Sequence, residues 1–171
     1  MLPSMNSLAR LLLPAVLAGL AAGFAASVLH YQLAEPLLSH LLGEPIAQRT
    51  GLRHWGSLLL REIPPAILQA TALIGLWQWR GVFPDWRQGV AWGIAGFAAA
   101  AVLRFGLLPQ WSGVPALPPL GGGLPIELQQ ALRWALLLCS FLTWLVLGLA
   151  AARAWRATRP RTHEHHAPGA P

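Results

Sequence analysis

Four long runs of apolar residues, separated by charged or polar positions, divide this chain. They cover about residues 8–30, 57–79, 89–108 and 128–152. A helix needs ~20 mostly apolar residues to cross the hydrocarbon core of a bilayer, and each run reaches about that length. The pattern therefore predicts an all-α fold, an integral membrane bundle of four transmembrane helices. Residues 1–156 then form a single transmembrane domain, and residues 157–171 form a flexible, histidine-containing tail.

The arginines gather on one side of this predicted bundle. With four spans, the N-terminus with Arg10, the turn with Arg80 and Arg87, and the C-terminal tail all share that side. The tail contributes Arg153, Arg156, Arg159 and Arg161. The opposite side has Arg49 and Arg53 in its first loop and no arginine in its second. Since basic residues concentrate in cytoplasmic loops, both termini are predicted to be cytoplasmic in a multi-pass protein of a bacterial-type inner (plasma) membrane.

Composition agrees with a membrane location and removes other classes of protein. The chain is 55% hydrophobic and 11% charged, whereas a soluble domain carries about 25% charged residues. Its excess of 12 basic over 6 acidic residues would suit nucleic acid, but the basic residues lie at the ends of apolar runs. We therefore expect the lipid bilayer, and no nucleic acid, as a partner. The first apolar run exceeds the ~7–15 residues of a signal-peptide core, so we expect a retained span.

Small residues recur at helical spacing in two of the predicted spans. Ala15, Gly19, Gly23 and Ser27 are four apart in the first span. Gly89 and Gly93 repeat that spacing in the third. Such stripes let helix backbones approach closely, which predicts a compact bundle or a contact between subunits. The lone Cys139 is expected to be a small packing residue.

Three arginines, Arg61, Arg104 and Arg133, fall toward the predicted outer ends of their helices. One interpretation is that they reach the lipid headgroups through their long apolar stems or pair with Glu62 and Glu127. The other is that they belong to a polar vestibule on the outer face. The sequence leaves both interpretations open.

Candidate metal ligands concentrate between the first two spans, in the predicted first outer loop. They are His30, Glu35, His40, Glu44 and His54. Imidazole and carboxylate groups are common ligands of borderline divalent ions such as cobalt, nickel and zinc. A short helix would place His40 and Glu44, four residues apart, on one face. The spacing matches no established signature such as HExxH, and solvated or hydrogen-bonded loop histidines are the alternative.

A second histidine cluster closes the chain. His163, His165 and His166 follow a basic stretch, and histidine-rich tails can gather transition metals. The neighbouring proline and glycine residues favour a disordered end instead. The predicted topology places this cluster inside the cell and the loop histidines outside, so the two groups are expected to be separate candidate sites.

Catalysis is not expected. A bis-histidine haem site needs facing histidines within the spans, and spans two to four contain none. The only aspartate, Asp85, is predicted on the opposite side of the membrane from the loop histidines, which excludes a Ser/His/Asp arrangement. The glycine run 121–123 lacks the Lys-Ser/Thr of a phosphate-binding loop. We expect no resident cofactor, and cobalt or another divalent transition-metal ion as a possible substrate.

Three stretches of the chain resemble the predicted cobalt-transporter subunit family CbtA. The first is the end of span one, where His30 precedes Glu35-Pro36. The second is Trp-Gly-Ile-Ala-Gly-Phe at residues 92–97. The third runs from the proline-rich outer loop through Leu-Pro-Ile-Glu-Leu, residues 124–128, into Arg133-Trp134 and span four.

The resemblance implies an integral membrane component of cobalt uptake, linked to cobalamin supply and paired with a small histidine-bearing subunit. It also implies a role for His30 and Glu35 near the outer membrane face. This chain departs from the family in having four predicted spans, where five are typical, and in ending with its own histidine cluster. A shortened relative could have kept the scaffold and lost transport.

Two functions follow from these features. The first is a membrane subunit of a divalent transition-metal uptake system, with cobalt as the favoured ion. The alternative is a non-catalytic accessory or scaffold subunit of a larger membrane complex that binds neighbouring helices, lipids or pigments. Four spans are few to enclose a complete pathway, so other membrane subunits or self-association are expected in either case.

Overall fold

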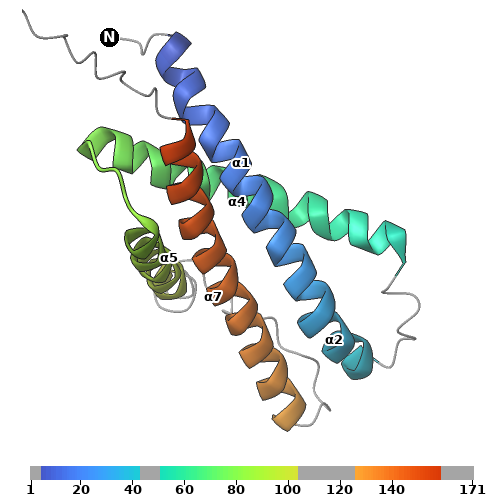
Figure 1. The fold of residues 1–171 in the computed structure, drawn as a ribbon. Coiled ribbons are helices and arrows are strands. Elements are labelled where there is room, and N and C mark those ends of the chain that lie inside the picture. Colours follow the sequence, from blue (N-terminus) through green and yellow to red (C-terminus); the bar gives the residue numbers. More distant parts are fainter. Residues whose placement is uncertain (1–4, 43–50, 104–125, 159–171) are drawn as a thin grey trace, which may run out of the picture.

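The computed structural model describes residues 5–42, 51–103 and 126–158, and these residues are almost entirely helical (Figure 1). The elements are α1 (Met5–Leu29), the π-helical turn η1 (His30–Ala34), α2 (Glu35–Leu42), α4 (Leu52–Arg80), α5 (Trp86–Ala101) and α7 (Ile126–Ala157). The predicted all-α class is confirmed. Within the described ranges the structure contains no β-strand.

Three helical stretches are long and apolar enough to cross a membrane. They are Leu11–His40, Leu52–Arg80 and Gln130–Ala157. They correspond to the first, second and fourth predicted spans, and they make a membrane location compatible with the fold. The third predicted span corresponds in position to α5, which the structure describes from Trp86 to Ala101 and which continues in a π-helical turn through residues 102–103. The end of that span, residues 104–108, lies outside the described residues.

The helices extend further than the apolar runs predicted. The first span was expected to end at His30, but the chain continues as helix through η1 and α2 to Leu42. The second was expected to begin near Ser57, whereas α4 begins at Leu52. Much of the predicted first outer loop is therefore helical. Its polar side chains lowered the hydropathy of η1, α2 and the start of α4, but they do not prevent the backbone from forming a helix.

Helices α1 and α7 run side by side, and α4 crosses them (Figure 1). The small-residue stripe of α1 makes the crossing close. A Cβ atom added at Gly23 would lie 2.6 Å from the Cα atom of Ile63, and Gly19 meets Ile67 in the same way. The predicted stripe is thus a packing surface within the chain.

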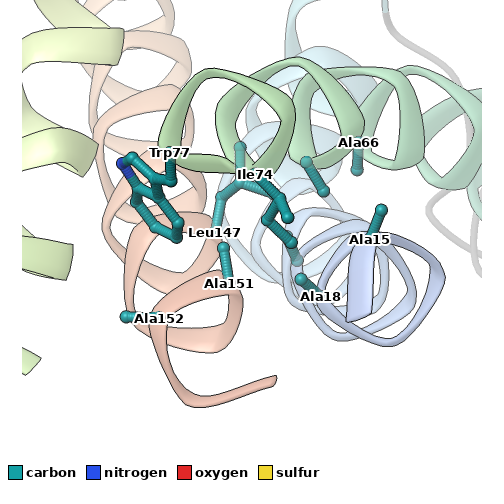
Figure 2. Packing of buried hydrophobic residues seen from close by; sticks show 10 residues of the cluster. Ala15, Ala18, Ala66, Ile74, Trp77, Leu147, Ala151 and Ala152 are labelled. Carbon is teal, nitrogen blue, oxygen red and sulfur yellow. The ribbon is translucent and has the colours of Figure 1, made fainter. Parts of the chain in front are cut away.

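The core lies where these three helices meet (Figure 2). Alanines line the α1 side, as at Ala15 and Ala18, and larger side chains from α4 and α7 fill the remaining space. The indole of Trp77 and the side chains of Ile74 and Leu147 are completely buried. Small residues on one helix facing large ones on its neighbours allow the interior to be densely packed.

Helix α5 packs mainly on α7. A Cβ atom at Gly89 would lie 2.7 Å from the carbonyl oxygen of Gly148, so both backbones need glycine at the contact. The preceding turn begins at Gly81, which ends α4 in the left-handed conformation with φ of 65°. It ends at Asp85, which caps α5 by accepting a 2.7 Å hydrogen bond from the backbone N–H of Gln88.

The α4–α5 turn is attached to the C-terminal end of α7. The indole N–H of Trp155 donates to the carbonyl of Val82 at 3.4 Å. The Phe83 and Trp155 rings stack with centroids 6.0 Å apart. Arg80, at the end of α4, therefore lies at the same end of the molecule as the arginines near the end of α7.

Candidate functional site

A polar cavity of about 500 Å³ lies between the α1–η1–α2 segment, α4 and α7. Its polar lining comes from all three: His30, Glu35, Arg61, Glu62, Gln69, Ser140 and Thr143. These residues belong to helices of spanning length, and Ser140 and Thr143 are near the middle of α7. The cavity thus brings ionisable groups into the helical body of the molecule.

The π-helical turn decides how the first segment faces this cavity. In an α-helix, each residue turns by about 100°, so residues five apart point about 140° away from each other. In η1 the backbone N–H of Glu35 donates to the carbonyl of His30, a bond across five residues. This wider turn brings both side chains to one face of the segment, and both line the cavity.

His30 and Glu62 form the first of two histidine–carboxylate contacts. Nδ1 of His30 lies 3.5 Å from Oε1 of Glu62 and 3.1 Å from the carbonyl oxygen of Ala26. The same Oε1 atom accepts a 2.9 Å hydrogen bond from Nε of Arg61. Of the two interpretations of Arg61, the structure therefore shows pairing with Glu62, and it places that pair at a polar cavity.

The tautomer of His30 follows from its backbone contact. A carbonyl oxygen only accepts hydrogen bonds, so the contact with Ala26 is a hydrogen bond when Nδ1 carries the proton. In the neutral ring, Nε2 is then left with its lone pair. A ring held through one nitrogen with the other available as a donor of electrons is the usual arrangement of a metal-binding histidine.

Glu35 and His54 form the second contact. Nε2 of His54 lies 3.1 Å from Oε1 of Glu35, whose side chain is only 6% exposed. The distance is that of a hydrogen bond, but Nε2 has no partner with hydrogen-bond geometry. The contact is therefore electrostatic and strongest when the imidazole is protonated. Ring contacts of Trp55 with Phe24 and Tyr31, at 6.2 and 5.1 Å, hold the start of α4 against α1 and η1.

Among the described residues, the predicted ligands thus take part in two separate contacts, His30 with Glu62 and Glu35 with His54. They do not form a ready cluster: within the described ranges no group of three or more His, Cys, Asp or Glu side chains could hold a metal ion. His40 is exposed on the last turn of α2. The other predicted ligands, Glu44, His163, His165 and His166, lie outside the described residues.

Sequence reasoning missed four lining residues as site residues: Glu62, Gln69, Ser140 and Thr143. The sequence does indicate Glu62, because a carboxylate near an apolar run needs a partner. From the sequence, Glu62 was expected only as a partner for arginine. The amide of Gln69, inside an apolar stretch, was a similar signal. Ser140 and Thr143 carry none, since hydroxyls in apolar helices commonly bond to their own backbone, as Thr143 does with the carbonyl of Cys139 at 2.7 Å.

Comparison with protein-family models, with curated proteins and with solved structures gives no match for this chain.

Proposed function

We propose that this chain is a membrane subunit that binds a divalent transition-metal ion and passes it on during uptake. The observation that carries the proposal is the cavity of about 500 Å³ whose lining includes His30 and Glu35 of the α1–η1–α2 segment and Glu62 of α4. Ionisable side chains inside spanning helices are costly, and they mark ion pathways and binding sites more often than structural contacts.

The donor set suits an ion that must be released again. Imidazole nitrogen and carboxylate oxygen bind cobalt, nickel and zinc, and without thiolates they form no closed cage. A bound cation would take the lone pair of Nε2 of His30, and it would compete with Arg61 for Glu62. The guanidinium can withdraw, because the Arg61 side chain is 60% exposed.

Cobalt is the ion we propose, on the resemblance of residues 30–36, 92–97 and 124–134 to the cobalt-transporter subunit family. The proposed protein crosses the bacterial-type inner membrane with both termini in the cytoplasm. The membrane potential or a partner subunit supplies the energy, and partner subunits or further copies complete the pathway.

A second candidate, an accessory subunit of a larger membrane complex, is favoured by one face of α1. This face carries large apolar side chains that are exposed in the chain: Leu12, Leu13, Val16, Leu17, Leu20 and Phe24. Lipid tails or the helices of a neighbouring subunit would cover it. Recovery of the protein from mild detergent as a monomer without partners would argue against this candidate.

Cobalt binding by the purified full-length chain tests the first candidate. In every variant the three tail histidines are replaced by alanine, so that metal bound by the tail is not counted. Glu62→Gln and His30→Gln should each weaken binding by about 10–100-fold, the range found when groups around a metal are removed. Glu127→Gln, which removes the same charge from an exposed position on α7, should leave binding unchanged.

The decisive result is the stoichiometry in equilibrium dialysis with metal analysis. One cobalt ion per chain, lost with Glu62→Gln and kept with Glu127→Gln, supports the proposal. Absence of cobalt, nickel and zinc from the protein after dialysis at micromolar metal, or equal binding by both variants, overturns it.

A further inference from the structure

A second hollow lies at the arginine-rich end of the molecule, beside the contact of α5 with α7. It is a groove of about 450 Å³, open at the surface, and Val146, Leu149 and Ala150 of α7 form much of its apolar wall. Arg153 and Arg156 continue the same lining toward the end of the helix. The groove shares no lining residue with the histidine–carboxylate cavity.

The charge in this groove is concentrated at one end. Arg153 and Arg156 are three residues apart, so they are neighbours on the surface of α7, and both are exposed. Neither takes part in an ion pair recorded among the described residues. The acidic group of the adjoining turn, Asp85, is engaged in capping α5. The groove therefore presents two guanidinium groups next to an apolar wall.

An aromatic ring also lines the groove. Trp86, the first residue of α5, lines the groove and is 64% exposed. Arg87 lies against its ring, with Cζ 5.3 Å from the ring centroid. Tryptophan side chains concentrate at the level of lipid headgroups, where one edge of the ring is apolar and the indole N–H is hydrated.

We propose that this groove binds an anionic phospholipid. One acyl chain would lie along Val146, Leu149 and Ala150, and the phosphate would bind between Arg153 and Arg156. A guanidinium forms paired hydrogen bonds with phosphate oxygens, and basic pockets at the ends of membrane helices bind anionic lipid headgroups. The apolar wall and the two charges together select a lipid over a soluble anion or an apolar helix. The proposal requires a membrane location and is independent of metal binding.

Native mass spectrometry of the full-length protein in mild detergent tests the proposal, with phosphatidylglycerol and phosphatidylcholine of the same acyl chains as probes. The double variant Arg153→Gln/Arg156→Gln removes the charges, and Leu149→Trp fills the apolar part while keeping them. The control Arg80→Gln/Arg133→Gln removes the same total charge from exposed positions outside the groove. Circular dichroism verifies that each variant is folded.

The wild type should retain one phosphatidylglycerol in preference to phosphatidylcholine. The double variant should weaken that binding by about ten-fold or more, as expected when contacts of about 1 kcal/mol per arginine are lost. Leu149→Trp should also weaken it, because the larger side chain occupies the place proposed for the acyl chain. The control should bind like the wild type. Equal retention of both lipids, an unchanged affinity in the double variant, an equal loss in the control, or displacement of the lipid by inorganic phosphate would each overturn the proposal.

Discussion

A single methyl group decides whether α5 can pack on α7. A Cβ atom at Gly93 would lie 2.5 Å from the carbonyl oxygen of Trp144, and the backbone of α7 cannot move away cheaply. We expect Gly93→Ala to destabilise the protein by about 1–3 kcal/mol, the usual cost of overpacking. Thermal unfolding in detergent, followed by circular dichroism, measures the change.

Gly56→Ala is the matched control for this change. Gly56 is also helical, but a Cβ atom there would meet nothing within 4 Å. Replacing glycine by alanine within a helix contributes up to about 1 kcal/mol, so Gly56→Ala should be neutral or stabilising. Equal unfolding temperatures for the two variants would contradict the close packing of α5 on α7.

Histidines 54 and 40 should differ in their effect on stability. His54→Gln removes one partner of Glu35, whose side chain is 6% exposed, and should cost about 1–3 kcal/mol, the cost of losing a partner of a buried polar group. His40 is exposed, so His40→Gln should change stability by no more than about 0.5 kcal/mol. Thermal unfolding of both metal-free variants checks the difference, and a larger loss with His40→Gln would contradict the assignment.

At the scale of residues, the sequence predicted some residues of the site but not which side chains contact each other. His30, Glu35 and His54 were identified by side-chain chemistry alone. Their pairing needed a fold, because His54 reaches Glu35 from another helix. The role of Glu62 was out of reach for the same reason: its neighbour His30 is 32 positions earlier, and α4 must cross α1 before they approach.

At the scale of elements, the π-helical turn η1 can be tested by a deletion. Removing Gln32, which is exposed, would turn η1 into regular α-helix. His30 and Glu35 would then be four residues apart and still on one face. We expect cooperative thermal unfolding to be retained, with the Glu35 contact to His54 preserved.

Deletion of Leu68 gives the comparison. Leu68 is also exposed, but it belongs to regular α-helix within α4. Its loss would rotate the rest of α4 by about 100° and turn Ile74 and Trp77 out of the core. This variant should lose cooperative unfolding. Equal damage from the two deletions would show that η1 cannot be shortened to a regular helical turn.

Hydropathy located the helices and misplaced their ends. The apolar runs predicted the positions of α1, α4 and α7, because exposed and core-facing residues are both largely apolar in these helices. The continuation through η1 and α2 was hidden by His30, Glu35 and His40, which read as loop residues. In the structure His30 and Glu35 are paired with other side chains and His40 is exposed, and a hydropathy pattern cannot predict either.

At the scale of the whole molecule, the proposed orientation can be checked at the two ends of α4. In a Cys139→Ala background, we expect Gly51→Cys to react with a membrane-impermeant maleimide added to intact bacterial cells. Arg80→Cys should react only after permeabilisation, because the arginine-rich end is proposed to face the cytoplasm. Both positions are exposed.

The reversed labelling pattern would contradict the orientation. Labelling of both positions in intact cells would contradict a crossing by α4. Pretreatment with a permeant maleimide, which should abolish both signals, is the control for specific reaction at the introduced cysteines.

The all-helical class was predictable from the sequence, and the arrangement of the helices was not. Apolar length and the arginine bias indicate a helical membrane protein regardless of how its helices meet. The crossing of α4 over α1 depends on Gly19 and Gly23 facing Ile67 and Ile63. The glycine spacing predicts such a surface but does not name the helix that covers it.

The packing of α5 has a consequence for the order in which the chain assembles. The backbone of α5 approaches α7 closely at Gly89 and Gly93. Its contact with α4 is between the rings of Trp92 and Trp77, whose centroids are 6.4 Å apart. During synthesis α5 leaves the ribosome before α7, so the contact of Gly89 and Gly93 with Gly148 cannot form until α7 has been made. Docking of α5 therefore follows the synthesis of α7, whereas α4 can pack on α1 before that. Until α7 is made, the glycine face of α5 lacks the helix that covers it in the folded chain.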